Sequence, residues 1–73
     1  MNNTSPPPIT RARWKDILSS EKGNILGFVS IRGERYGGRL LSYDADSALV
    51  RSSGGLNVQI FRSQTVAVML GGD

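Results

Sequence analysis

The stretch GERYGGRLLSYD, residues 33 to 44, decides how this chain folds. Two adjacent glycines interrupt a run that otherwise favours a β-strand, and the run ends with Tyr43 and Asp44. A strand that serves two sides of a small barrel must bend sharply, and glycine lacks the side chain that would collide at such a bend. We therefore predict that Gly37 and Gly38 form the corner of a strongly bent strand.

A phosphate-binding loop is the alternative interpretation of the same stretch. Residues 33 to 40 differ at two positions from the pattern G-x-x-x-x-G-K-[ST]. Arg39 replaces the lysine, Leu40 replaces the hydroxyl that would hold magnesium, and no helix is predicted after them. The chemistry of a phosphate loop is therefore missing, and a strand corner is the better interpretation.

Hydrophobic spacing predicts one helix and five strands around this corner. Trp14, Ile17 and Leu18 recur at helical spacing behind a candidate N-cap at Thr10, which predicts a helix over residues 11–21. Period-two patterns and turn residues then predict strands over 25–32, 35–43, 47–52, 56–62 and 65–70. The expected fold is mainly β, with an N-terminal α-helix followed by a five-stranded, strongly bent antiparallel small barrel of the SH3-like type. We expect residues 1–9 to be a flexible, proline-rich arm and residues 10–73 to be a single domain.

Composition limits what such a domain can do. A chain of 73 residues buries only about 60% of its unfolded surface. With no Cys and no His, neither a disulfide nor a usual metal site supports it, so we expect self-association and no cofactor. The net charge of +3 permits a nucleic-acid partner. No signal peptide or membrane-spanning run is present, which predicts a cytoplasmic protein without a membrane partner.

Two motifs carry a resemblance to a known family. Gly33, Gly38, Leu40 and Tyr43-Asp44 stand at the spacing of the first Sm motif, and Phe61-Arg62-Ser63 with Val66 and Val68 is similar to the second. Over residues 10 to 70 the chain therefore resembles the Sm-like family, which includes the Sm rings and bacterial Hfq. The resemblance implies a bent five-stranded barrel whose fourth strand pairs with the fifth strand of a neighbour. It also implies a homo-oligomeric ring of about five to seven subunits.

The family binds single-stranded RNA, typically uridine-rich, against two loops of each subunit. Carried over to this chain, the first loop includes Asp44, Asp46 and Ser47, and the second is Arg62, Ser63 and Gln64. Arg11 and Arg13, at the start of the helix, are further candidates for contact with RNA phosphates. The chain departs from the family pattern at Asp46, where an aromatic or histidine usually stacks on the base, and a carboxylate supplies no stacking. It also departs at Ala48 and Ser63, which replace an asparagine of Sm proteins and a histidine of Hfq.

Each candidate has a structural alternative. Asp44 lies at a turn, where an Asp side chain usually caps backbone amides. Arg62 is equally well explained by an ion pair with Asp44 or Asp46, and Trp14 is better explained by packing over the barrel than by base stacking. Arg11 and Arg13 are equally compatible with a solvated surface.

Three functional hypotheses follow from these residues. The first is a ring-forming, RNA-binding chaperone or scaffold, with Arg62 as its main contact. The second is a ring-forming protein-interaction or assembly module that has lost the RNA pocket. The third is a monomeric SH3-like barrel. We do not expect an enzyme, because no nucleophile–base pair or metal-ligand cluster is recognisable.

Overall fold

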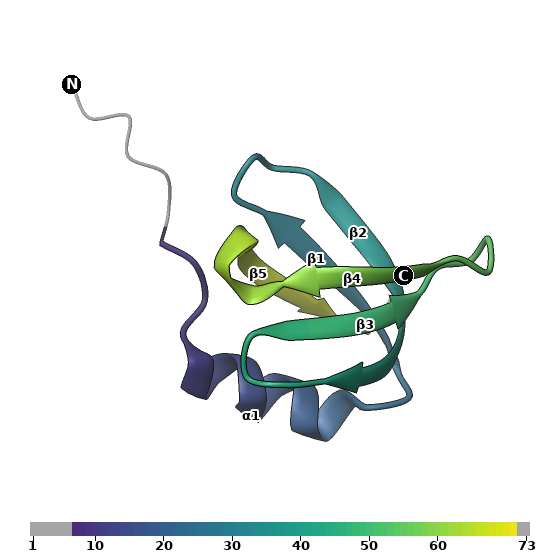
Figure 1. Ribbon diagram of the computed structural model, residues 1–73, viewed down its shortest axis with the longest axis horizontal. Coiled ribbons are helices and arrows are strands. Elements are labelled where there is room, and N and C mark those ends of the chain that lie inside the picture. Colours follow the sequence, from purple (N-terminus) through teal and green to yellow (C-terminus); the bar gives the residue numbers. More distant parts are fainter. Residues whose placement is uncertain (1–6, 72–73) are drawn as a thin grey trace.

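The computed structural model describes residues 7–71 and has one helix followed by five strands (Figure 1). Helix α1 spans Arg11–Glu21. The strands are β1 (Ile25–Ser30), β2 (Arg35–Tyr43), β3 (Ser47–Arg51), β4 (Asn57–Phe61) and β5 (Thr65–Leu70), with a 3₁₀ turn η1 at Arg62–Gln64. They form one antiparallel sheet in the order β4-β3-β2-β1-β5. The predicted fold class is confirmed, and the curled sheet is barrel-like with β4 and β5 as its outer strands.

Helix α1 has the predicted bounds because its start and its buried side follow local rules. The Thr10 hydroxyl accepts a hydrogen bond from the backbone N–H of Arg13 at 3.2 Å, which caps the first turn. Trp14 and Leu18 lie four positions apart and are completely buried, whereas most other helix residues are exposed. The chain leaves the helix through Gly23, whose φ of 88° lies in the left-handed region that favours glycine. The helix therefore covers the core with one narrow face.

Strand β2 changes its partner strand directly after its adjacent glycines. The strand pairs with β1 through Arg35–Arg39 and with β3 through Arg39–Tyr43, and its register with β3 shifts between Leu40 and Ser42. A Cβ added at Gly38 would lie 2.3 Å from the backbone oxygen of Arg51, whereas one at Gly37 would lie 3.4 Å from the oxygen of Leu26. Gly38 therefore permits the close approach of the chain that leaves β3, and Gly37 is much less constrained.

Strands β1, β3 and β4 end earlier than predicted, β3 by one residue at Arg51, and β4 also begins one residue later than predicted, at Asn57. Strand β1 stops at Ser30 because the chain turns there, with the Gly33 N–H donating to the Ser30 oxygen at 2.9 Å and Gly33 at a φ of 86°. Strand β4 stops at Phe61 because the next three residues form η1. Strand β2 and strand β5 have the predicted bounds.

The core lies between α1 and the inner face of the curled sheet. Trp14 and Phe28 are its largest members, with ring centroids 5.9 Å apart. The other buried hydrophobic residues are Leu18, Leu26, Leu40, Ala48, Val50 and Ile60. The Trp14 indole Nε1–H donates to the Asp44 backbone oxygen at 2.9 Å, so its polar atom is satisfied inside the protein. The prediction that Trp14 packs in the fold is confirmed.

The predicted arm falls mostly outside the described residues. Residues 1–6 lie outside them, and Pro7 and Pro8 are exposed. Ile9, which the sequence assigns to the arm, instead belongs to the fold. Its N–H donates to the Thr65 oxygen at 2.9 Å, and its side chain packs against the core.

Candidate functional site

Three segments that are distant in the sequence meet at Asp46. They are the start of α1, the turn between β2 and β3, and the η1 turn between β4 and β5. The Asp46 carboxylate accepts hydrogen bonds from Arg11 Nε at 2.9 Å and from Arg62 Nη2 at 3.4 Å. The Arg62 backbone N–H also donates to the Asp46 backbone oxygen at 2.8 Å. We call Arg11, Asp46 and Arg62 the Asp46 cluster, and it unites three of the residues that the sequence nominates for RNA binding.

Asp44 shapes the turn that presents Asp46. Its Oδ1 accepts from the backbone N–H groups of Asp46 and Ser47, both at 2.8 Å, and from the Ser47 hydroxyl at 3.2 Å. The two backbone bonds, more than the hydroxyl, hold the pKa of the Asp44 carboxyl below its ordinary value. The structural interpretation of Asp44 is therefore confirmed, because its carboxylate caps the turn.

Ser47 is buried at the first position of β3, directly after the turn from β2. The residue is only 8% exposed, and its hydroxyl donates to Asp44 and accepts from Gln59 Nε2 at 3.3 Å. These two bonds use its hydroxyl hydrogen and one of its lone pairs. At this turn the Ser47 hydroxyl supports Asp44, and its assignment to the RNA loop stays a prediction.

Arg62 is held by its own chain. Its side chain is 18% exposed, and Nη1 donates to the Ile9 backbone oxygen at 2.8 Å. Its Nε and Nη2 both point at Asp46 Oδ1. Of the alternatives that the sequence left open, the ion pair with Asp46 of the same chain is present. Arg62 thus links the Asp46 turn to the segment just before α1.

The remaining predicted residues are open to solvent. Ser63 and Gln64 lie in η1 and are exposed, and the Gln64 backbone oxygen accepts from the N–H of Ile31 at 2.9 Å. Arg13 is exposed on α1, one turn from the cap. These three hydrogen-bonding or cationic side chains are therefore exposed on η1 and α1, the elements that also carry Arg62 and Arg11.

The charges of the cluster are unequal, with two guanidinium groups for one carboxylate. Arg11, through its hydrogen bond, is the main cause that holds the pKa of the Asp46 carboxyl below its ordinary value, and Arg62 adds to it. Asp46 and Arg11 are 58% and 67% exposed in their side chains, so water screens this pair. The two guanidinium groups can bind an anion, but in this structure they already bind the carboxylate of Asp46.

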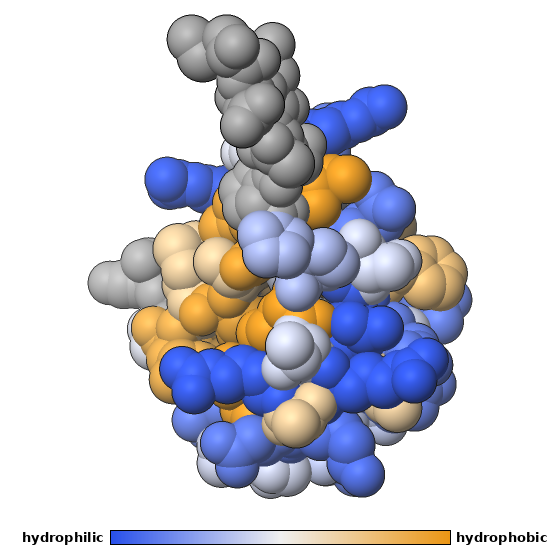
Figure 2. Space-filling model, turned by 90° about the vertical axis from the view of Figure 1, so that its left-hand side faces the viewer, coloured by the Kyte–Doolittle hydropathy of each residue, from blue (hydrophilic) through white to orange (hydrophobic). Residues whose placement is uncertain are grey.

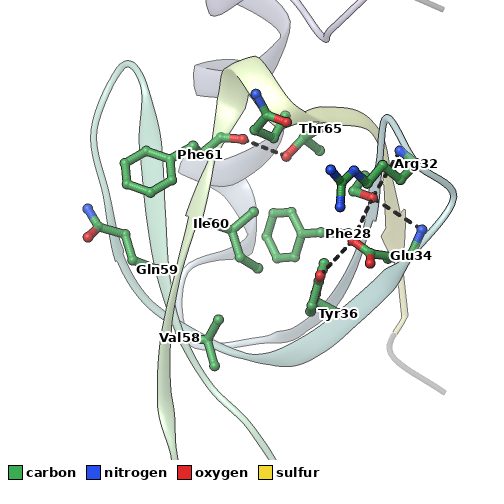
Figure 3. Close-up of a pocket in the computed structure, with 11 residues that line it drawn as sticks. Phe28, Arg32, Glu34, Tyr36, Val58, Gln59, Ile60, Phe61 and Thr65 are labelled. Atoms are coloured by element: carbon green, nitrogen blue, oxygen red, sulfur yellow. Dashed lines mark hydrogen bonds between the residues drawn. The ribbon is translucent and has the colours of Figure 1, made fainter. Parts of the chain in front are cut away.

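A pocket of about 330 Å³ lies next to η1, between β4 and the β1–β2 turn (Figure 3). Phe28 and Ile60 face each other in it, whereas Gln59 and Phe61 lie on the opposite side of β4. At its far wall the Tyr36 hydroxyl donates to Glu34 Oε1 at 2.9 Å, and this bond raises the pKa of the tyrosine. The pocket is mainly apolar and adjoins the open edge of β4.

A larger groove lies at the other end of β3. It has a volume of about 750 Å³ and is lined by Arg35, Arg39 and Arg51 together with Ile25 and Met69. Arg39 and Arg51 are direct partners across β2 and β3. No carboxylate of residues 7–71 forms an ion pair with any of these three arginines. This grouping could not be predicted from local sequence patterns, because it depends on the pairing register of β2 and β3 beside the irregularity between Leu40 and Ser42.

Other chemistry has little support in the described residues. Within residues 7–71, no three His, Cys, Asp or Glu side chains lie close enough together to hold a metal ion. No helix in the same range is long and apolar enough to cross a bilayer.

No protein-family model, curated protein or solved structure matches this chain. The resemblance to Sm-like proteins that the two sequence motifs indicate therefore stays a prediction.

Proposed function

We propose that this protein is an Sm-like subunit that assembles into a ring and binds single-stranded RNA at the Asp46 cluster, as a chaperone or scaffold. The single observation that supports RNA binding is the meeting of α1, the β2–β3 turn and η1 at one exposed, net-cationic cluster. Such a cluster suits phosphate recognition, because guanidinium groups bind phosphate through charge-assisted hydrogen bonds.

Assembly is supported by the two outer strands of the sheet. Within residues 7–71, strands β4 and β5 each have one neighbouring strand, so each leaves one edge without a strand partner. Large apolar side chains are exposed on or beside them, including Phe61 at 51%, Met69 at 41% and Leu70 at 57%. On the side of the molecule that carries η1, hydrophobic side chains form a band among hydrophilic ones (Figure 2). Pairing of β4 with β5 of a second copy would satisfy both edges at once.

A ring would strengthen weak RNA contacts. Repeating the cluster around an axis places several binding loops at a high effective concentration along one strand of RNA. Ser63 and Gln64 offer hydrogen-bonding groups for base edges, and Arg13 is a further exposed cation in the first turn of α1. Rings of about five to seven subunits are expected for this architecture.

Light scattering tests assembly directly. The wild-type protein should have a mass of several subunits, and Phe61→Lys should shift it towards one subunit, because a lysine on an edge strand opposes pairing. Leu56→Lys is the matched control. Leu56 is 70% exposed in the β3–β4 hairpin but lies outside the strand ladder, so this variant should keep the wild-type mass. A wild-type protein of one-subunit mass would contradict the proposal.

Titration of labelled oligo-U and oligo-A at two salt concentrations tests RNA binding. Charge-driven binding should weaken as salt rises, because displaced counterions supply the driving force. Arg11→Gln should weaken binding and lower the salt dependence by about one counterion per lost contact. Lys15→Gln, at an exposed cation of the same helix outside the cluster, should have a smaller effect. An assembled protein that binds neither oligonucleotide at low salt would contradict this part of the proposal.

An assembly module without an RNA pocket is the second candidate. The engagement of Arg62 with Ile9 and Asp46 favours it, because the best-placed guanidinium already has internal partners. Purification from the native host separates the two functions. RNase-sensitive nucleic acid supports the first, and a stoichiometric protein partner that survives RNase supports the second.

A further inference from the structure

We infer that Asp46 regulates the proposed RNA site by competing with RNA phosphates for Arg11 and Arg62. This inference rests on the proposed RNA-binding function and assigns a role to one residue within it. The contacts of Asp46, its fixed position and the charge of its neighbours carry the argument.

A single oxygen of Asp46 takes the hydrogen bonds of both arginines. Oδ1 lies 2.9 Å from Arg11 Nε, and 3.4 Å from both Nε and Nη2 of Arg62. Carboxylate and phosphate oxygens accept from the same guanidinium donors. The two ion pairs found in residues 7–71 are both made by Asp46. An incoming phosphate would therefore meet arginines whose donors are already directed at an anion.

The backbone holds this internal anion in place. The Asp46 N–H donates to Asp44 Oδ1 and the Asp46 oxygen accepts from the Arg62 N–H, each at 2.8 Å. A short side chain on a fixed backbone loses little rotamer freedom when it forms an ion pair. The carboxylate thus competes at high effective concentration, while a bound phosphate must arrive from solution.

The two arginines differ in how easily they can change partner. Arg11 is 67% exposed and can turn from Asp46 towards a ligand. Arg62 is 18% exposed and keeps its bond to the Ile9 oxygen. RNA would therefore recruit Arg11 first and gain Arg62 only by displacing the carboxylate. Asp46 lowers the affinity of the site for any ligand that offers a single phosphate, and favours continuous RNA that engages several subunits.

A purely structural role of Asp46 makes the opposite prediction. If the ion pairs served only to hold the loops, then Asp46→Asn would loosen the site and leave RNA binding unchanged or weaker. Competition predicts that the same variant binds RNA more tightly, since asparagine retains the backbone bonds but carries no charge. The sign of the change in affinity therefore separates the two roles.

The experiment measures fluorescence anisotropy of labelled oligo-U with the full chain, after light scattering has established the mass of each variant. Asp46→Asn should bind about three- to tenfold more tightly than wild type, with a steeper salt dependence. Asp16→Asn is the charge-matched control, because Asp16 is exposed on α1 and its side chain bonds no arginine among the described residues. Asp46→Ser provides a second variant without the carboxylate, and thermal unfolding verifies that each variant folds.

A double variant localises the effect. When Arg11→Gln is already present, the gain from Asp46→Asn should shrink, because one of the two competed donors is gone. Equal gains for Asp46→Asn and Asp16→Asn, or a gain that persists unchanged without Arg11, would overturn competition while leaving RNA binding intact. If the wild-type protein and every variant fail to bind at low salt, the proposed function fails and competition with it.

Discussion

The arginines at the two ends of strand β3 have different partners. Where β3 begins, Arg11 and Arg62 meet the carboxylate of Asp46. Where β3 finishes, Arg51 stands directly across from Arg39, and like charges on opposed strand positions repel. At the first end a carboxylate neutralises part of the charge. At the second end Arg39 Nη1 donates to the Gly23 backbone oxygen at 2.6 Å, and no carboxylate of residues 7–71 forms an ion pair with Arg39 or Arg51. Arginines at the two ends of one strand thus differ in whether an internal carboxylate neutralises them.

The comparison also concerns backbone packing. At the Asp46 end, side chains and backbone bonds close the turn, with Asp44 accepting from two N–H groups. At the Arg51 end, the chain passes close to Gly38, where a side chain does not fit. The Asp46 end therefore depends on the hydrogen bonds that the Asp44 side chain accepts, whereas the Arg51 end depends on the absence of a side chain at Gly38.

The largest effect is expected from filling the space at Gly38. Gly38→Ala would place a methyl 2.3 Å from a backbone oxygen, which cannot move without shifting β3. We expect a loss of about 3 kcal/mol in the free energy of unfolding, at the upper end of overpacking effects. Gly37→Ala is the matched control, because its methyl would lie 3.4 Å from the nearest backbone oxygen and should be tolerated. Urea unfolding measures both, and similar losses in the two variants would refute the assignment of the corner to Gly38.

A smaller effect is expected from the opposite end, and it depends on pH. Because the folded state lowers the pKa of Asp44 and Asp46, their ionised forms stabilise the fold above the unfolded-state pKa of about 3.9. That stabilisation should be lost as the pH falls through the lower folded-state values. Asp44→Asn should reduce stability near neutral pH and flatten its decline in acid. Asp16→Asn should retain the wild-type profile, and urea unfolding between pH 7 and pH 2 is the test.

The smallest effect is expected from relieving the arginine pair. Arg51→Glu should raise the free energy of unfolding by about 0.2–1 kcal/mol, because an opposite charge replaces a like charge across the strands. Arg35→Glu is the control, since its partner on β1 is Val29. The gain should decrease as salt screens the charges. A gain of equal size in the control would mean that net charge, and not the cross-strand pair, limits stability.

Much of this fold could be predicted because its signals are local. The Thr10 cap, the spacing of Trp14 and Leu18, and the alternation of Val58 and Ile60 each depend on a few neighbouring residues. The Gly37-Gly38 corner was also predicted, although only Gly38 meets backbone at close range. Local propensity and tertiary structure agree at these positions, which is typical of a consistently encoded small domain.

The contacts of the candidate site were harder to predict because they join distant residues. Arg62 donates to the oxygen of Ile9, 53 positions away, and no periodic pattern reports a backbone acceptor. Ser47 was assigned to the RNA loop, yet Asp44 and Gln59 cover its hydroxyl. The sequence correctly placed an ion pair among the alternatives for Arg62, but the choice of partner required the folded turn.

The position of Ile9 has a practical consequence for experiments. Its hydrogen bonds to Thr65 and Arg62 bring the N-terminal side of the fold to the beginning of β5 and beside the Asp46 cluster. An affinity tag or fluorophore fused before Ile9 would be attached next to the Asp46 cluster, the proposed RNA-binding site. A label attached after Leu70 departs from the opposite end of β5, so C-terminal fusions are the better design for binding assays.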